Sequence, residues 1–365
     1  MSSANLKSLS TADTDYSADS VEWCPHEPHQ NIFVCGTYQL SQNETQNSIM
    51  KNDLPHKRVG KMLLYKYLGD QNLVLLQTKF TSAILDQKWC HNQINGKSLL
   101  GVVNADGFLQ IYELIIIEKE ISLELFVEVC VNSEFEDNLA LSLDWNTGRN
   151  ESQNPDVIVT DSKGYATVWN LNATGLEMKH RFYAHEFEAW IGAFDYWDTN
   201  IIYTGGDDCK FKIYDLRCGV SINCSRCHNG GVTSMHSNKL HQYYLATGSY
   251  DENLLLWDTR QRKTPLSTTS LNGGVWRLKW DPFTCQTLLA ACMYNGFHII
   301  NCKNLSENPS VIAEYHEHES IAYGADWSYL KLNTSSNSAN ESNEKLLAIC
   351  SFYDHTLSVL KLSDE

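Results

Sequence analysis

One short pattern returns repeatedly along this chain and limits the folds that it can adopt. Its clearest copy is GGVTSMHSNKLHQYYLATGSYDENLLLWDTR, residues 230–260, in which two alternating apolar runs flank a polar turn at Tyr250 to Asn253. Alternation with a period of two is typical of a half-buried β-strand. The second run ends in the dipeptide Trp257-Asp258. Two such strands, the turn and this dipeptide are typical of a WD repeat, which forms one blade of a propeller.

The same unit occurs elsewhere when the chain is aligned on the turn and on the end of the strand that follows it. Five further copies are NADGFLQIYEL (104–114), TDSKGYATVWNL (160–171), TGGDDCKFKIYDLR (204–217), MYNGFHIINC (293–302) and FYDHTLSVLKL (352–362). The equivalent terminal residues, Trp257 among them, lie 57, 45, 43, 44 and 59 positions apart. One blade needs ~40–45 residues, so two of these intervals contain insertions. A weaker first copy ends in GKMLLYKYL (60–68).

Seven copies predict an all-β fold, a seven-bladed WD40-type β-propeller that occupies residues 1–365 as a single domain. Residues 1–18 precede the first inner strand, and we expect them to form an N-terminal tail or a strand that closes the last blade. The segments 41–58 and 333–345 are expected to be loop insertions at the surface. The second of them, NTSSNSANESNEK, contains almost no apolar residue.

The charge balance and the absence of long apolar runs limit the expected partners. The chain has 28 Lys and Arg against 44 Asp and Glu, a formal net charge of −16. Nucleic-acid binding depends on clustered basic residues, so we expect no nucleic-acid partner and favour a cationic ligand. No apolar run approaches the ~18 residues of a membrane span, and no signal peptide is evident. We therefore expect a cytoplasmic protein that does not bind membranes and keeps its 12 cysteines reduced.

Two histidines occupy positions that favour a structural role. In WD blades a His, a Ser or Thr, the turn Asp and the terminal aromatic residue form a buried hydrogen-bond chain. The matching residues are His185, Thr204, Asp208 and Tyr214 in the fourth blade and His228, Thr247, Asp251 and Trp257 in the fifth. The segment from Cys224 to His228 also matches the haem-attachment pattern C-x-x-C-H. Because its histidine is assigned to the blade, we predict no haem, no metal and no other cofactor.

The register of the repeats predicts an aromatic mouth at one end of the propeller. The residues before the turn Asp and those at the start of each inner strand should face that end. In blades four to seven they supply six aromatic side chains, Trp190, Tyr250, Trp276, Tyr294, Tyr323 and Tyr353, with the acidic residues Glu188, Asp207 and Asp326 nearby. Aromatic faces beside carboxylates suit a quaternary ammonium group, through cation–π attraction of ~0.5–2 kcal/mol per ring. Packing of these rings against loops or against a protein partner remains an alternative.

Several segments resemble a known family over nearly every blade. They are SADSVEWCP, TSAILDQKWCH, LALSLDW, HEFEAWIGAFDYW, LATGSYDENLLLWDTR, GGVWRLKW, LLAACMYNGF and YGADWSYL. Together they resemble the diphthine methylesterases, the WD-repeat proteins of diphthamide biosynthesis. The resemblance implies hydrolysis of the methyl ester of methylated diphthine, which is built on a histidine of elongation factor 2, to diphthine and methanol. It also implies elongation factor 2 as the partner, with other diphthamide-pathway proteins as further partners. The intermediate carries a trimethylammonium group, which suits the predicted mouth.

Ester hydrolysis needs a group that accepts and returns a proton and donors for the developing oxyanion. The candidates at the mouth are His355 and Asp354 of the FYDH turn, Asp207, and Arg277 as an oxyanion or carboxylate partner. Ser249 as a nucleophile and His185 as a further candidate are left open. Two other functions compete with the esterase. One is a noncatalytic scaffold that binds elongation factor 2 or pathway enzymes, as most WD propellers bind proteins. The other is recognition of methylated lysine by the same aromatic mouth.

Overall fold

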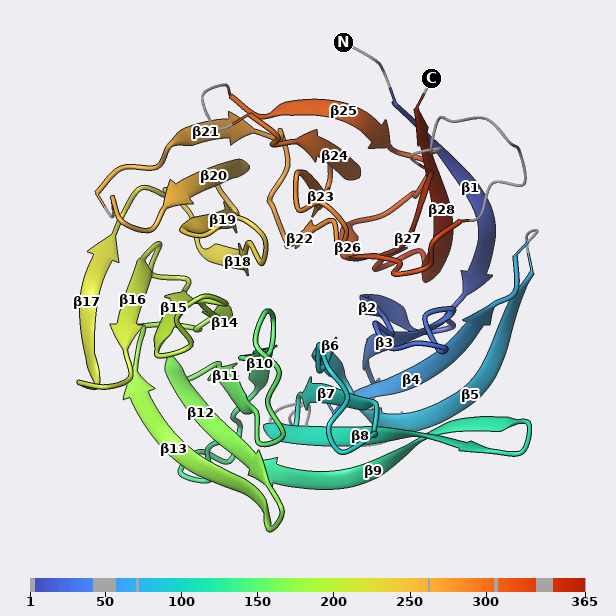
Figure 1. The fold of residues 1–365 in the computed structure, drawn as a ribbon, viewed down its shortest axis with the longest axis horizontal. Coiled ribbons are helices and arrows are strands. Elements are labelled where there is room, and N and C mark those ends of the chain that lie inside the picture. Colours follow the sequence, from blue (N-terminus) through green and yellow to red (C-terminus); the bar gives the residue numbers. More distant parts are fainter. Residues whose placement is uncertain are drawn as a thin grey trace, which may run out of the picture.

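The computed structural model describes residues 4–41, 57–69, 72–261, 263–304, 308–332 and 344–364. Most of the two predicted insertions, and the first three residues of the predicted tail, lie outside these ranges. Within the described residues the fold is a propeller of seven four-stranded antiparallel sheets, which confirms the predicted fold class (Figure 1). No helix in this part of the chain has the length and apolarity to cross a membrane.

The first three blades follow the chain in simple order, each running from its inner strand to its outer strand. Blade one contains β2 (Ser17–Trp23), β3 (Ile32–Leu40), β4 (Arg58–Tyr67) and β5 (Leu73–Ser82). Blade two contains β6 (Ile84–Trp89), β7 (Leu99–Asn104), β8 (Phe108–Ile117) and β9 (Glu120–Cys130). Blade three contains β10 (Ala140–Trp145), β11 (Asp156–Asp161), β12 (Tyr165–Asn172) and β13 (Gly175–Tyr183).

The next three blades repeat this order, and the last blade joins the two ends of the chain. Blade four contains β14 (Ile191–Phe194), β15 (Ile201–Gly205), β16 (Phe211–Asp215) and β17 (Val220–Ser225). Blade five contains β18 (Val232–Ser237), β19 (Tyr244–Ser249), β20 (Asn253–Asp258) and β21 (Ser267–Ser270). Blade six contains β22 (Arg277–Trp280), β23 (Thr287–Ala291), β24 (Phe297–Asn301) and β25 (Ser310–Tyr315). Blade seven contains β26 (Ala322–Trp327), β27 (Lys345–Ser351), β28 (Thr356–Asp364) and, as its outer strand, the N-terminal β1 (Ala4–Asp13).

Tryptophans at the ends of the inner strands join neighbouring blades. Trp23, Trp145 and Trp327 are almost completely buried. Four indole N–H groups donate to a backbone carbonyl of the preceding blade: Trp89 to Glu22 (3.2 Å), Trp145 to Lys88 (2.9 Å), Trp280 to His236 (3.0 Å) and Trp327 to Lys279 (2.9 Å). Side chains alternate between the faces of a strand, so the residue before each tryptophan points the other way. This alternation determines which residues surround the central axis.

The structure confirms the predicted hydrogen-bond chain in blade five. His228 contacts the carboxylate of Asp251 through Nδ1 (3.1 Å) and the hydroxyl of Thr247 through Nε2 (2.8 Å), and the indole of Trp257 donates to the same hydroxyl (2.9 Å). All of these groups are buried or nearly so. His228 therefore belongs to the frame of its blade.

Blade four repeats the first part of this chain. His185 contacts Asp208 through Nδ1 (2.8 Å) and Thr204 through Nε2 (2.9 Å). The hydroxyl of Tyr214 differs from Trp257 because it donates to the carbonyl of Ala184 (3.5 Å). Both imidazole nitrogens of His185 are thus engaged within the blade, which assigns it to the frame as well.

Candidate functional site

Four of the six predicted aromatic side chains form one continuous cluster. Ring centroids lie 5.7 Å apart for Trp190 and Trp276, 5.9 Å for Tyr250 and Trp276, and 4.7 Å for Trp276 and Tyr323. Phe352, which the sequence reasoning missed, extends the cluster at 5.0 Å from Tyr323. We call these five residues the aromatic mouth. Only the position directly before the turn Asp was used in the sequence alignment of the turns. Phe352 lies two residues before Asp354 and was therefore missed.

The other two predicted tyrosines stand at the edge of this cluster. Tyr353 contacts the ring of Phe352 at 4.9 Å and is 69% exposed, and Tyr294 is 83% exposed. Tyr294 lies near enough to contribute to the electrostatic environment of Tyr323. Both therefore lie at the exposed rim of the aromatic mouth.

Two of the predicted carboxylates lie beside the aromatic mouth. Asp207 Oδ1 accepts a hydrogen bond from the indole Nε1 of Trp190 (3.0 Å). Burial, aided by the carboxylates of Asp207 and Glu188, raises the pKa of Tyr250, and burial is also the main reason that the pKa of Tyr323 is raised. The phenols thus stay neutral at physiological pH. Neutral aromatic faces next to negative charges form an environment that attracts cations.

A small cavity lies beneath the aromatic mouth. It is lined by Asp19, Leu85, Leu141, Ser142, Trp190, Thr233, Trp276 and Arg277. The guanidinium of Arg277 forms an ion pair with Asp86 (3.1 Å), and both side chains are buried. Arg277, proposed from the sequence as an oxyanion or carboxylate partner, is therefore placed directly below the rings.

Asp19 is the unexpected feature of this cavity. Its side chain is buried, and within the described residues its Oδ1 has no hydrogen-bond partner. Burial raises the pKa of Asp19 well above its usual value, an effect that the charge of Arg277 opposes. The indole Nε1 of Trp276 is likewise a buried donor without a partner in this part of the chain. Buried polar groups normally find partners, so an unused acceptor and an unused donor mark a place for a polar ligand.

The FYDH turn does not bring its carboxylate into the cavity. Asp354 accepts hydrogen bonds from the hydroxyl of Ser351 and from the backbone N–H of Glu319 (3.0 Å). The turn aspartates of blades four and five accept backbone N–H groups in the same way. The expectation that Asp354 points to the mouth is therefore corrected, because its carboxylate is engaged in its own blade.

The neighbouring histidine belongs to the junction between the first and last strands. The carbonyl of His355 accepts from the N–H (2.9 Å) and the hydroxyl (3.0 Å) of Thr14, and its imidazole lies near Asp15. His355 has a positive φ of 55°. The catalytic role of His355 stays a prediction. Asp19, in contrast, lines the cavity beneath the rings.

Asp326 does not join the aromatic mouth, contrary to the sequence expectation. Its Oδ2 accepts the backbone N–H of Trp23 (2.8 Å), its Oδ1 lies 3.6 Å from the ammonium of Lys279, and it lines a separate cavity. Asp326 lies three residue steps after Tyr323, and at about 3.3 Å per step the two positions are about 10 Å apart along β26. Closeness in the sequence therefore does not bring Asp326 to the level of the rings.

That separate cavity borders a set of polar residues that the sequence reasoning missed. In six blades the residue next to the end of the inner strand is charged or is a histidine: Glu22, Lys88, Asp144, His236, Lys279 and Asp326, with Ala193 at this position in blade four. We call these six residues the charged belt. The available signal was a charged residue directly before a tryptophan in VEW, QKW, LDW, LKW and ADW.

Among the described residues, no group of three or more His, Cys, Asp and Glu side chains is arranged to hold a metal ion.

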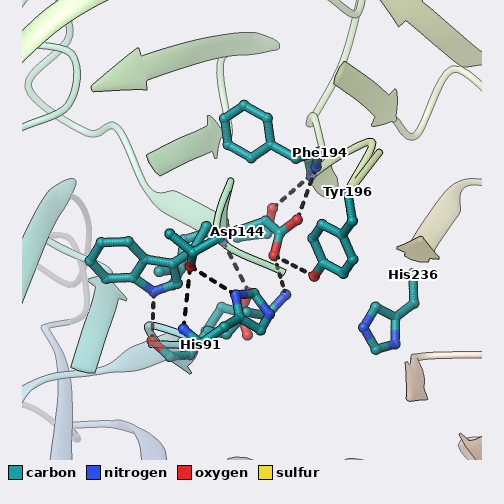
Figure 2. Close-up of polar contacts among 12 residues, drawn as sticks. His91, Asp144, Phe194, Tyr196 and His236 are labelled. Atoms are coloured by element: carbon teal, nitrogen blue, oxygen red, sulfur yellow. Dashed lines mark hydrogen bonds and ion pairs between the residues drawn. The ribbon is translucent and has the colours of Figure 1, made fainter. Parts of the chain in front are cut away.

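Tyr196 completes the belt where blade four supplies only alanine. Its hydroxyl donates to Asp144 Oδ1 (3.1 Å), and the ammonium of Lys88 contacts the same oxygen (3.1 Å). Asp144 Oδ2 accepts the backbone N–H of Phe194 (2.9 Å). Figure 2 shows Tyr196 between His91 and His236, with ring centroids 5.2 Å and 6.1 Å away. The belt is thus a connected polar network inside the propeller.

Comparison with known proteins identifies close relatives. The model of the WD domain, G-beta repeat, matches residues 219–258. The chain is 43% identical to the human protein named diphthine methyltransferase over 88% of this chain and 75% of the relative. It is 35% identical to a Dictyostelium discoideum homologue of that name over 94% of this chain and 96% of the relative. A chain of the mitotic checkpoint complex shares the fold, with a TM-score of 0.71 at 14% identity over 99% of this chain and 93% of that chain.

Proposed function

The chain belongs to the diphthine methyltransferase family, and from this premise we propose that it is a methylesterase of diphthamide biosynthesis. Its substrate would be methylated diphthine on elongation factor 2, and its products diphthine and methanol. The relatives are named as methyltransferases, which supports a reaction that involves a methyl group, and we propose water as its acceptor. The observation that carries the proposal is a cation-attracting aromatic mouth above a cavity that holds an arginine and a carboxyl group with one unpartnered oxygen.

The aromatic mouth suits the trimethylammonium group of the substrate. Trp276, Tyr323 and Tyr250 offer neutral faces, and Asp207 and Glu188 add negative charge beside them. Methylated diphthine carries both the methyl ester and the trimethylammonium group on one modified histidine side chain. A cation held at the rings therefore brings the ester toward the cavity underneath, where Asp19 and Arg277 lie.

The cavity residues suit hydrolysis of the ester. A water molecule adds to the carbonyl carbon, and Asp19 in its ionised form accepts a proton from it. Arg277 stabilises the negative charge that develops on the carbonyl oxygen. The acyl–oxygen bond then breaks, Asp19 returns the proton to the departing methoxide, and methanol leaves. A carboxyl group with a raised pKa is suited to both the acceptance and the return of a proton.

The exposed rim residues suit the protein that carries the substrate. Tyr294 and Tyr353 are largely solvent-exposed tyrosines next to the mouth, and tyrosine is frequent in the energetically important part of protein interfaces. We propose that they contact the surface of elongation factor 2 around the modified histidine.

The direct test uses purified elongation factor 2 that carries methylated diphthine. We expect incubation with the protein to lower the mass of the factor by one methylene group and to release one equivalent of methanol. No mass change with the protein in excess would contradict the esterase. Stable binding of the factor without a mass change would indicate the scaffold function, and equal binding of a trimethyllysine peptide would indicate a reader of methylated lysine.

Replacing one ring of the aromatic mouth should weaken substrate binding. We expect Trp276→Leu or Tyr323→Leu to raise KM about 2- to 30-fold, the factor that corresponds to ~0.5–2 kcal/mol of lost cation–π attraction. Steady-state kinetics with the modified elongation factor measure this effect, and thermal melting checks the fold. Phe80→Leu is the matched control, because Phe80 is 73% exposed on the outer strand of blade one. If KM is unchanged while the melting temperature falls sharply, the rings serve packing.

A further inference from the structure

The two ends of the inner strands carry different kinds of side chain. The aromatic mouth uses residues at or just before the start of an inner strand, such as Trp276 and Tyr323, whereas the charged belt lies near the end of each strand. About three residues separate the two levels, which corresponds to about 10 Å. The belt and its cavity are therefore distinct from the site of the proposed esterase reaction.

The acidic members of the belt already have cationic partners. Lys279 contacts Glu22 and lies 3.6 Å from Asp326, and Lys88 lies 3.1 Å from Asp144. Asp326 and Asp144 also accept hydrogen bonds from N–H and O–H groups of neighbouring blades. The negative charges of the belt are thus neutralised within the protein.

A second cavity shares His91, Tyr196 and His236 with the cavity of the charged belt, and one cationic side chain there has no such partner. Lys239 lines the cavity with His91, Tyr196, His236 and Tyr329. Its ammonium lies 6.0 Å from the centre of the Tyr329 ring, and among the described residues no carboxylate is within ion-pair distance of it. Lys239 therefore adds an uncompensated positive charge to this cavity.

His236 adds a fixed hydrogen-bond donor. Its Nδ1 accepts the backbone N–H of Trp280 (3.0 Å), which requires the proton of the neutral imidazole to reside on Nε2. In the part of the chain that the structure describes, Nε2 has no partner, and His236 lines the same cavity as Lys239. The ring therefore presents an N–H that an external acceptor can use.

Three lysine charges act on the two histidines of this cavity. Burial lowers the pKa of both His91 and His236 well below the usual value, and the nearby charges of Lys88, Lys239 and Lys279 lower it further. Both imidazoles are neutral at physiological pH for this reason. A cavity that holds an unpaired ammonium and a free N–H donor is suited to an anionic oxygen acceptor.

We propose that this cavity is a binding site for a small oxyanion, held by the ammonium of Lys239 and the Nε2–H of His236. The shared chemistry is a compact anionic oxygen group, supplied by a free phosphate or by a small carboxylate. The proposal does not depend on the esterase, because it uses other residues at the other end of the inner strands. One propeller thus carries a cation site and an anion site.

Calorimetric titration of the full-length protein with inorganic phosphate and, separately, with acetate tests the site. We expect saturable binding of at least one anion, with phosphate alone indicating a phosphate site and acetate alone a carboxylate site. Lys239→Met should weaken binding at least tenfold, whereas Lys7→Met, at an exposed lysine of β1, should not change it. Tetramethylammonium probes the aromatic mouth instead. Trp276→Leu should weaken its binding, and Lys239→Met should leave it unchanged.

A spectroscopic measurement covers the case in which a variant misfolds. In the wild-type protein the imidazole ¹⁵N and ¹H resonances of His236 Nε2–H should shift during titration with the anion that binds. No saturable binding of either anion, or an equal loss of binding in Lys7→Met, would overturn the proposal. A failure of the esterase assay would leave the anion result unaffected.

Discussion

Asp19→Asn should lower kcat for release of methanol from modified elongation factor 2 by about 10²–10⁴-fold, the range typical for loss of a general base. Asparagine has nearly the same shape as aspartate but cannot accept the proton of the attacking water. KM should change little, because the aromatic rings that hold the cation are untouched. The measurement is single-turnover and steady-state kinetics of the two proteins.

The pH dependence of the activity distinguishes a catalytic role of Asp19 from a purely structural one. Burial raises the pKa of Asp19 in the folded protein. Wild-type activity should therefore rise with pH as this carboxyl ionises, and the residual activity of Asp19→Asn should lack that rise. Stability should behave in the opposite sense. A raised pKa means that the folded state holds its proton longer, so wild type loses stability relative to Asp19→Asn as pH rises through the folded pKa.

Asp106→Asn is the control, since Asp106 is an exposed carboxylate in the turn of blade two. We expect it to retain wild-type activity and pH dependence. Full activity in Asp19→Asn would remove Asp19 from the mechanism. His355 and Asp207, the candidates that the sequence indicated, would then be tested by the same kinetics.

The fold could be predicted from the sequence because each blade contains the repeated pattern within its own residues. Alternating strands, a polar turn and a terminal aromatic residue recur at the blade spacing, and the His228 chain depends on four residues of a single repeat. The mouth was partly predictable for the same reason, because Trp190, Trp276 and Tyr323 occupy equivalent register positions.

What the sequence could not provide depends on contacts between blades. Asp19 was visible as a register position, but its burial and its proximity to Arg277 arise from blades that are far apart in the chain. Asp326 was misplaced because a strand carries neighbouring motif residues to opposite ends of the axis. The charged belt was missed because each member alone resembles an ordinary solvated charge beside a tryptophan.

Substitution of a lysine in the charged belt should strongly reduce the stability of the fold. Lys279→Met should reduce the free energy of unfolding by about 3–5 kcal/mol, because removing one member of a buried ion pair leaves its partners uncompensated. The side chains of Lys279, Glu22 and Asp326 are 9%, 7% and 8% exposed. Chemical denaturation measures the change. Lys179→Met is the control, since the ion pair of Lys179 with Asp156 is at the surface, with 44% of the lysine side chain exposed, and should contribute at most about 1 kcal/mol.

The pH dependence and a compensating variant separate charge from packing in this result. Burial raises the pKa of Glu22 to about 8, although Lys279 opposes that rise. Without Lys279 the pKa of Glu22 should rise further, so the stability deficit of the variant should grow as the pH rises and the carboxyl ionises. Adding Glu22→Gln and Asp326→Asn to Lys279→Met should recover most of the loss, since no buried charge then lacks a partner. A deficit that is independent of pH and persists in the triple variant would show that Lys279 contributes through its packing, and that the belt is not an electrostatic network.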